Sequence, residues 1–285
     1  MPQSLRVLKS RIRTAKNIAQ LAKTLEMVSV AKIRRARGLA ETVRPYAERI
    51  TALGDTALRS VAPGEFVHPY LGSKGPEGAR LLLVIGPDKG LCGALVSNLA
   101  RKMFEEDTPE SRVIAVGKRV QAPAARMAGS RLVAAFPIGT KLPEYSLVYD
   151  LVLTINDHIM SGRASTLDVL YTRFVSYFTQ VPTIERVLPL VPAPASEASE
   201  RQFHTIEPDL PGLLEELLPH YLEVRLFDAV IQSYSSEHGA RMVAMQNAKK
   251  NALEIADSFT LLYNKTRQER ITNEILDLAN TGTRA

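Results

Sequence analysis

One stretch near the C-terminus, residues 219–280, constrains the fold more than any other part of the chain. After Pro219 it contains no proline and a single glycine, Gly239. Its other residues are mostly Ala, Leu, Met, Glu, Lys, Arg and Gln, which favour helices. A helix of about 60 residues would be about 90 Å long, which exceeds the width of an ordinary domain. We therefore expect a long helix that extends beyond its own domain and needs a partner for its apolar face.

The N-terminal segment offers that partner. Both ends of the chain carry apolar residues at intervals of three and four, the spacing of a coiled-coil seam. On the C-terminal side these are Met245, Ala248, Ala252, Ile255, Phe259 and Leu262, and on the N-terminal side Leu5, Leu8, Ile12, Ala15, Ala19 and Ala22. A second N-terminal stripe consists of Ile18, Leu21, Leu25 and Val28. The alternative is that both segments are core helices of a bundle, although bundles of this size usually use shorter helices.

Prolines and glycines divide the chain around these helices. Pro45 should kink or end the first helix, although residues 46–58 still have a helical composition. A breaker-rich linker at 72–78 and a Pro/Ser-rich loop at 189–200 enclose the middle of the chain. A short helix at 209–218 should precede the long one, with Pro219 in its first turn. We expect three domains: 1–60, 79–195 and 209–285.

The middle of the chain alternates between strand and helix patterns. Short apolar runs at 80–85, 112–116 and 131–136 indicate buried strands, and helices should follow through residue 106, at 118–127 and at 145–160. Residues 166–178 alternate as a strand, with 184–190 as a hairpin partner. The fold class is α/β: a small, partly parallel, Rossmann-like central domain joined to two long helices.

No catalytic or cofactor motif emerges from this pattern. The glycine-rich loop 86–93 lacks the Gly-Lys-Ser/Thr of a phosphate-binding loop, and its glycines have the wrong spacing for a dinucleotide fingerprint. Cys92 is the one cysteine, which excludes an internal disulfide, and we interpret it as a small buried hydrophobe. The five histidines show no metal-ligand spacing. The chain is predicted to be a mechanical or scaffolding part, not an enzyme, and to use no cofactor or metal.

Three segments carry a family resemblance. The runs SRIRTAKNIAQLAKTLEMVSVAKI (10–33), DKGLCGALVSN (88–98), and SEHGARMVAMQNA with NKTRQERITNEI (236–248 and 264–275) occur in this order. They resemble the γ subunit family of F-type ATP synthases, over nearly the whole chain. One departure is the polar C-terminal end, 276–285, where the family often has a Gly/Ala-rich apolar tip.

The resemblance implies a function and a set of contacts. The two helices would form an antiparallel coiled coil, the central rotor shaft within a ring of α and β subunits (α3β3). The shaft would couple ion-driven rotation of the membrane c-ring to ATP synthesis or hydrolysis. The ε subunit and the c-ring would be further partners, and the complex would lie peripherally on the cytoplasmic side of a bacterial membrane. The residues assigned to subunit contacts or coupling are Leu25, Arg34, Arg35, Arg37, Lys89, Arg241, Arg267, Gln268, Thr272 and Glu274.

The charge distribution and the order of elements at 81–105 leave two other functions open. Residues 1–50 contain twelve Lys/Arg and three Glu, a net charge of +9, whereas the whole chain carries +6. This basic segment permits a coiled-coil adaptor that binds nucleic acid or a membrane surface. However, it lacks aromatic stacking residues before Tyr46, so acidic protein partners are preferred. The strand, glycine loop and helix at 81–105 would also permit a nucleotide-binding enzyme.

Overall fold

The computed structural model describes residues 5–60, 66–72, 80–190 and 209–282, and it describes side chains up to residue 276. Two compact units make up the chain. One consists of residues 1–29 and 241–285, and the other of residues 30–240. Both long helices, α1 (Leu5–Ser60) and α5 (Leu210–Gly282), contribute residues to each unit. The predicted division into 1–60, 79–195 and 209–285 remains a prediction.

The unit formed by residues 30–240 is built on a five-stranded sheet of order β3-β2-β1-β4-β5. Strands β1 (Arg80–Ile85), β2 (Arg112–Val116), β3 (Leu132–Phe136) and β4 (Thr166–Phe174) pair in parallel. The edge strand β5 (Gln180–Leu188) pairs antiparallel with β4, which confirms the predicted hairpin. The α/β fold class is confirmed, with a parallel-rich sheet as predicted.

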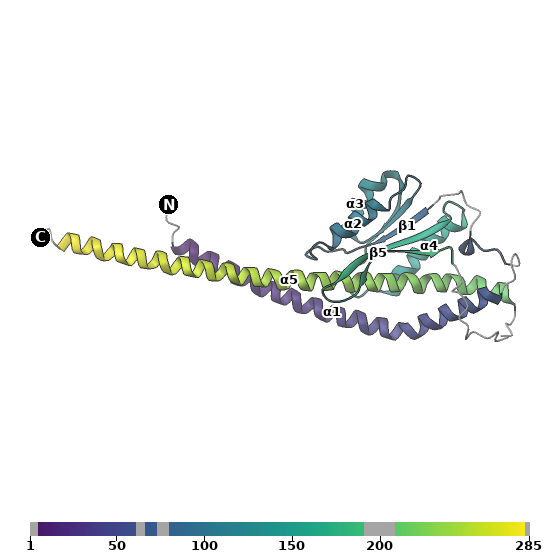
Figure 1. Ribbon diagram of the computed structural model, residues 1–285, viewed down its shortest axis with the longest axis horizontal. Coiled ribbons are helices and arrows are strands. Elements are labelled where there is room, and N and C mark those ends of the chain that lie inside the picture. The colour runs from purple at the N-terminus through teal and green to yellow at the C-terminus, as the bar shows by residue number, and fades with distance from the viewer. Residues whose placement is uncertain (1–4, 61–65, 73–79, 191–208, 283–285) are drawn as a thin grey trace. The chain divides into compact units, whose positions relative to one another are not determined.

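Helices cover both faces of this sheet, and the alternation of side chains along β1 shows how. Leu82 and Val84 pack with α2 (Leu95–Glu105) and α3 (Lys118–Ala128), whereas Leu81, Leu83 and Ile85 pack with α4 (Tyr145–Met160) and α5. Figure 1 shows α2 and α3 above the sheet and α5 beneath it. Because helices cover both faces of the sheet, every residue from 81 to 85 is apolar, as the continuous apolar run predicted.

The helix α1 passes through Pro45 and continues to Ser60, as the helical composition of residues 46–58 indicated. Two other predicted element boundaries are wrong. The short helix predicted at 209–218 is the first part of α5, which passes through Pro219 without ending. Strand β4 ends at Phe174 rather than near residue 178, because residues 175–179 form the hairpin turn.

Tertiary packing explains why Pro219 does not end α5. A proline removes one helical hydrogen bond, which costs a helix interior about 3 kcal/mol. Around Pro219, three leucines within one turn and a half are buried: Leu217, Leu218 and Leu222. Burying each of these side chains contributes roughly 2 kcal/mol, which offsets that loss. The predicted linker at 72–78 and the loop at 189–200 fall almost entirely outside the described residues.

Candidate functional site

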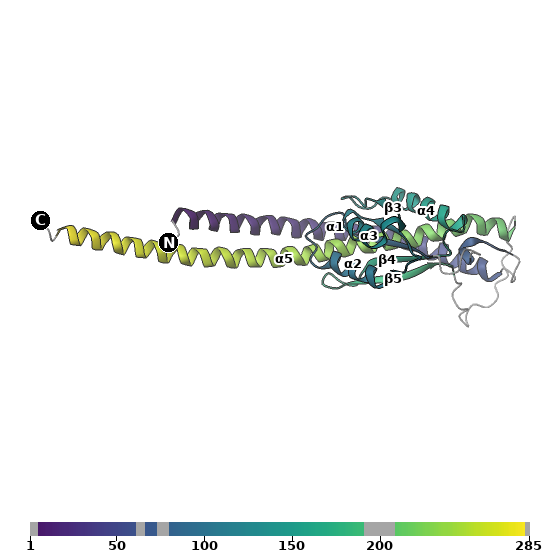
Figure 2. The same cartoon turned by 90° about the horizontal axis from the view of Figure 1, so that it is seen from above.

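The two long helices pack against each other in the unit of residues 1–29 and 241–285. The buried apolar positions on α1 are Leu8, Ala15, Ala19 and Ala22, and those on α5 are Met245, Ala252 and Ala256. Figure 2 shows the two helices side by side in this unit. Alanine at most seam positions lets the two backbones approach closely, so the predicted stripe on α1 is confirmed and the pairing is a coiled coil.

Two contacts show that the helices run in opposite directions. Lys249 Nζ lies 3.0 Å from Glu26 Oε2, and the Arg11 guanidinium lies 5.5 Å from the centroid of the Phe259 ring. As the residue number falls along α1 from 26 to 11, it rises along α5 from 249 to 259. The pair is therefore antiparallel, as the family resemblance implied.

The seam on α5 differs from the prediction at two positions. Ile255 and Leu262 were expected in the seam but are 49% and 41% exposed, whereas Ala256 is buried. The second stripe on α1 is also exposed: Ile18, Leu21, Leu25 and Val28 have between 38% and 65% of their surface accessible. Helical spacing alone cannot show which of two neighbouring stripes on a helix faces the other helix. The buried stripe is the one with small residues, because these allow the two backbones to approach more closely. The unit therefore exposes apolar side chains on its surface.

The predicted contact residues near the C-terminus lie on the surface of α5. Arg267, Gln268, Thr272 and Glu274 are exposed. Thr272 donates a hydrogen bond to the Gln268 carbonyl, and Glu274 pairs with Arg270 at 2.8 Å. Since exposed ion pairs contribute little to stability, these polar groups remain available to exchange partners.

Leu25 and Arg241, which the resemblance connects with coupling, are placed differently. Arg241 is 8% exposed on α5, and Leu25 is 38% exposed on α1. Both belong to the coiled-coil unit. Arg241 is therefore packed within the unit, whereas Leu25 offers part of its side chain to the outside.

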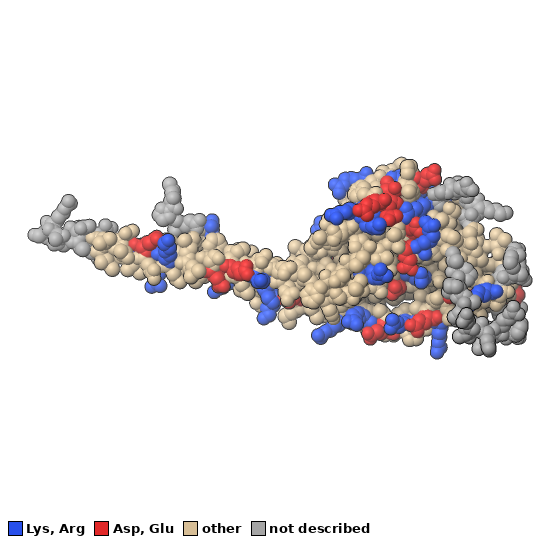
Figure 3. Space-filling model, viewed as in Figure 1, with Lys and Arg blue, Asp and Glu red and all other residues tan. Residues whose placement is uncertain are grey.

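The arginines Arg34, Arg35 and Arg37 lie exposed on α1, while Ile33 and Ala36 on the other side of the helix are fully buried. Nearby, Lys32 Nζ donates a hydrogen bond to the Thr140 carbonyl. In the face of the 30–240 unit that Figure 3 displays, basic and acidic side chains are interleaved. That surface does not form the single basic field that a nucleic-acid backbone requires.

The loop that carries Lys89 is held rigidly. The Asp88 carboxylate accepts hydrogen bonds from the backbone N–H groups of Lys118, Ile138 and Gly139 at 2.8, 3.2 and 3.0 Å. This carboxylate joins the β1–α2 loop to the ends of β2 and β3. Lys89 is exposed and Cys92 is buried, as expected for a structural cysteine. The three hydrogen bonds to Asp88 therefore fix the backbone next to the exposed Lys89 side chain.

The same loop exposes an apolar residue in an unusual conformation. Leu91 has φ +62° and is 66% exposed. A non-glycine residue in the left-handed region costs about 1–2 kcal/mol. The residue before α2, Ala94, supplies no side-chain cap. The loop thus exposes the Leu91 side chain, and its sequence lacks the Gly-Lys-Ser/Thr of a phosphate-binding loop.

Several polar clusters escaped the sequence analysis because their members are far apart in the chain. The Asp168 carboxylate forms two ion pairs, with Arg80 Nε at 2.6 Å and with Arg186 Nε at 2.9 Å. Glu223 accepts a hydrogen bond from the Tyr145 hydroxyl at 2.6 Å. Burial and this contact raise the pKa of the Tyr145 hydroxyl above its ordinary value. These clusters connect strands and helices, and no local motif could have revealed them.

In the described part of the chain, no group of three or more His, Cys, Asp or Glu side chains is positioned to hold a metal ion.

None of the described helices has both the length and the apolar character needed to cross a bilayer.

Comparison with known proteins gives a consistent family. A family model described as ATP synthase matches residues 4–285. The ATP synthase gamma chain of Dehalococcoides mccartyi is 37% identical over 281 residues, with 96% of both chains covered. That of a Roseiflexus species is 39% identical over 288 residues, with 97% of both chains covered.

Solved structures show the same fold at lower identity. A chain of the Euglena gracilis mitochondrial ATP synthase, in an OSCP/F1/c-ring structure, has a TM-score of 0.67 and 20% identity, with 98% of this chain and 93% of that chain covered. A chain from the central stalk and c-ring of the Tetrahymena thermophila mitochondrial ATP synthase has a TM-score of 0.61 and 17% identity, covering 80% of this chain and 99% of that chain.

Proposed function

The chain belongs to the ATP synthase gamma chain family, and from this premise we propose that its paired helices act as the rotor shaft that transmits torque to the catalytic subunits. Its place in the central stalk of an F-type ATP synthase follows from its family. The shaft couples ion-driven rotation of the membrane ring to ATP synthesis or hydrolysis. Which subunits its individual residues touch is part of the proposal.

The observation that carries this function is the antiparallel, alanine-lined pairing of residues 8–26 with residues 245–259. A shaft must transmit torque without fraying, and two wound helices with continuous backbone hydrogen bonds resist bending better than loops. Its sides must also differ, because a catalytic subunit changes state only through contacts that favour one conformation over another. The exposed stripe of Ile18, Leu21, Leu25 and Val28 on α1 supplies such a difference between sides.

The proposed partners are the α and β subunits, the ε subunit and the c-ring. Arg267, Gln268, Thr272 and Glu274 would form and break hydrogen bonds with loops of the catalytic subunits as the shaft turns. Arg34, Arg35 and Arg37 would contact acidic regions of the same subunits, where their positive charges are favourable. Lys89 would contact a C-terminal region of the β subunit. Leu25 and Arg241 would couple rotation to catalysis through the helix pair.

The proposed role needs no catalytic group in this chain. We infer a non-catalytic subunit without its own cofactor, associated peripherally with the cytoplasmic side of a bacterial membrane through the rest of the complex. The burial of the Cys92 thiol and the lack of a Gly-Lys-Ser/Thr sequence in the loop 86–93 support this role.

Purification through a tagged copy tests the assembly. Chains of the α, β and ε subunits and of the c-ring should co-elute and be identified by mass. Co-expression with α and β should raise the yield of the soluble chain, because the apolar side chains of its coiled coil are exposed when it is expressed alone. Elution of the tagged chain without these subunits would contradict the proposal.

Charge removal tests the proposed acidic contacts. The triple variant Arg34→Gln, Arg35→Gln, Arg37→Gln should weaken coupling of ATP hydrolysis to rotation several-fold, with less dependence on salt. The control removes three exposed charges from α2 and α3, in Arg101→Gln, Lys118→Gln, Arg126→Gln. Equal losses in the two variants would argue against specific contacts at the arginines. Salt-sensitive binding of DNA or anionic vesicles that requires these arginines would instead favour the adaptor function.

A further inference from the structure

Helix α4 carries a stripe of exposed apolar residues that the proposed shaft does not use. Three large side chains on its outer side are about half exposed: Tyr149 (55%), Leu153 (52%) and Met160 (56%). At 3.6 residues per turn, these three and Asn156 fall within a sector of about 60° around the helix. Figure 2 shows α4 on the side of the unit opposite β5. Aligned apolar side chains of this size form a continuous patch, which is typical of an interaction site.

The two helices on the other face of the sheet expose a different kind of surface. In α2 one large apolar residue is exposed, Phe104, and it lies between the charged residues Arg101 and Glu105. All of α3 is described, and its exposed side chains include Lys118 and Arg126 but no large apolar one. The apolar stripe is therefore a property of α4 and not of every helix that covers this sheet.

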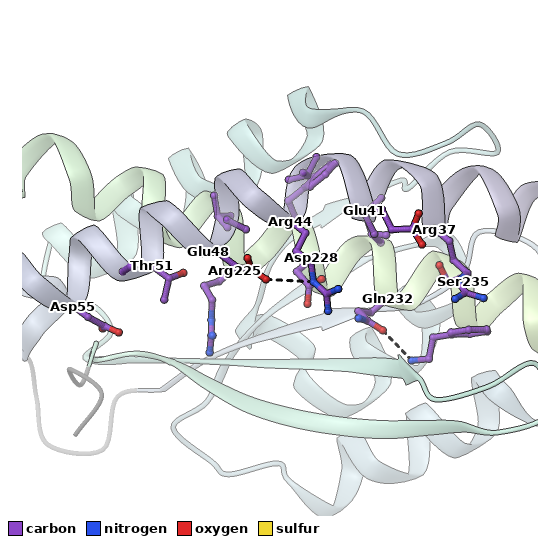
Figure 4. A pocket seen from close by; sticks show the side chains of 18 residues that line it. Arg37, Glu41, Arg44, Glu48, Thr51, Asp55, Arg225, Asp228, Gln232 and Ser235 are labelled. Atoms are coloured by element: carbon purple, nitrogen blue, oxygen red, sulfur yellow. Dashed lines mark hydrogen bonds and ion pairs between the residues drawn. The ribbon is translucent and has the colours of Figure 1, made fainter. Parts of the chain in front are cut away.

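The groove between α1 and α5 in the same unit also differs from α4, because its charges are mixed. Figure 4 shows guanidinium groups and carboxylates along both of its walls, among them Arg37, Arg44, Arg225, Glu41, Glu48 and Asp228. Arg44 pairs with Glu48 at 3.4 Å, so opposite charges offset each other there.

The spacing of the α4 stripe selects a helix as its occupant. The steps are four, three and four residues, along Tyr149, Leu153, Asn156 and Met160. This is the a/d spacing of a coiled-coil seam, in which the side chains of a second helix insert between those of the first. The Asn156 side-chain oxygen accepts a hydrogen bond from the Tyr70 hydroxyl, which holds it in place. A single asparagine within an apolar seam fixes the register of two paired helices.

The open flank of the stripe is acidic. Asp150 and Asp157 are exposed and lie seven residues apart, so that both stand on the same side of the seam. The sequence of α4 contains no Lys or Arg. Asp157 pairs with Arg163 at 2.5 Å, and among the described ion pairs none includes Asp150. The opposite flank is closed, because Val152 and Ile159 are buried against the rest of the unit.

This acidic flank distinguishes between possible occupants. Two copies of α4 packed antiparallel would bring Asp150 of one copy near Asp157 of the other, and like charges repel. An anionic membrane surface would be repelled in the same way. A helix with Lys or Arg beside its apolar seam would instead gain from the charges on both aspartates.

We propose that α4 docks an amphipathic helix of a partner protein. Its apolar side chains pack between Tyr149, Leu153 and Met160, and basic side chains seven residues apart face Asp150 and Asp157. About three turns of the partner helix, roughly 16 Å, cover the stripe. The inference is independent of the proposed shaft, since none of the residues assigned to the shaft's contacts lies on α4.

Three synthetic peptides, each about three heptads long, test the surface. The first has leucine at its seam positions and lysine beside the seam, the second replaces the lysines with glutamate, and the third keeps the lysines but has serine in the seam. Their affinities are measured by fluorescence anisotropy on the purified complex that contains the full chain. The first peptide should bind at least about tenfold more tightly than either of the others. Equal binding of the lysine and glutamate peptides, or no binding of the first peptide, would overturn the proposal.

Two variants with matched controls locate the site on α4. Leu153→Ser should weaken binding of the first peptide at least about fivefold, whereas Phe104→Ser, at a residue that is 49% exposed on α2, should leave it unchanged. Equal affinities in these two variants would count against α4 as the docking surface.

The charge variant Asp150→Lys should weaken binding of the lysine peptide and strengthen binding of the glutamate peptide, because it reverses the flank. The control Glu110→Lys makes the same change at an exposed position between α2 and β2 and should alter neither affinity. A preference that Asp150→Lys leaves unchanged would show that the flank does not select the partner.

Discussion

Lys249 Nζ lies 3.0 Å from Glu26 Oε2, although 223 positions separate the two residues in the chain. Their side chains are 32% and 22% exposed, so that water screens the pair less than an ordinary surface ion pair. The pair joins α1 to α5 beside an alanine-lined seam that has few side-chain contacts to define the register. We infer that it helps to set the register of the two helices, as buried polar pairs do in other coiled coils.

Reversing either charge should weaken this pairing, and reversing both should restore it. Glu26→Lys or Lys249→Glu alone brings like charges together and should lower the free energy of unfolding by about 1 kcal/mol. The double variant should recover most of this loss. Circular dichroism of the four proteins during urea unfolding gives the coupling energy as a double-mutant cycle. Additive losses in the double variant would show that the pair makes no contribution of its own.

A disulfide should close between the two seams. Cysteines replacing Ala19 and Ala252, both about 5% exposed, should form an intramolecular bridge under mild oxidation, seen as a shift in non-reducing gel mobility. The comparison variant pairs Ala252→Cys with Leu21→Cys, because Leu21 is 65% exposed on the outer side of α1. Native Cys92 is buried and should not interfere. If the comparison pair crosslinks as readily as the seam pair, the proposed seam is wrong.

Enlarging a seam residue should separate the helices. Ala22 is 4% exposed, and Ala22→Leu inserts three carbons where the backbones approach, which should cost about 1–3 kcal/mol. Ala31→Leu makes the same change at an exposed position of α1 and should shift stability by less than about 0.5 kcal/mol. The melting temperatures of the two variants check this difference. Similar values for both would mean that close backbone contact is not needed.

His68 should make stability depend on pH. Its Nδ1 accepts a hydrogen bond from the Tyr70 backbone N–H at 3.1 Å, and its ring stacks on Phe66. Burial lowers the pKa of His68 below 6.5, and nearby Glu215 only partly opposes this. Between the folded and unfolded pKa values the unfolded chain binds more protons. The contribution of His68 is therefore fully present above about pH 6.5 and is lost as the pH falls toward the folded pKa.

His68→Asn tests this dependence, since asparagine keeps an acceptor near the Tyr70 N–H but does not titrate. The free energy of unfolding of the wild-type protein should decrease between about pH 7 and 5 more steeply than that of the variant. Parallel curves for the two proteins would assign the pH dependence to other groups.

Gly117 should be intolerant of any side chain. Its φ is +100°, and a Cβ added there would lie 1.9 Å from the Gly86 carbonyl oxygen. Gly117→Ala should therefore displace the β1–α2 loop and cost roughly 2–4 kcal/mol. Gly129 also has a positive φ, +54°, but its Cβ would meet no atom within 4 Å. Gly129→Ala should cost about 1 kcal/mol. Thermal unfolding ranks the two variants, and equal costs would show that the Gly86 contact is not limiting.

Local pattern in the sequence determined most of the secondary structure. Residue composition predicted two long helices, because helix propensity and the three-and-four spacing of apolar residues are properties of neighbouring positions. The continuous apolar run at 81–85 predicted a strand covered on both faces, and the structure confirms it. The DKGLCG segment and the two terminal runs were enough to indicate the family, which the comparisons confirm.

Only the tertiary structure decided which of two adjacent stripes forms the seam. Ile255 and Ala256 are neighbours on the same helix, and which of them is buried depends on how closely the second helix approaches. Pro219 carries a local signal for a helix end, but burial of Leu217, Leu218 and Leu222 overrode it. The Glu26–Lys249 pair and the Arg80–Asp168–Arg186 cluster join residues that are far apart in the chain. Sequence spacing carries no information about such contacts, because their geometry exists only after the chain has folded.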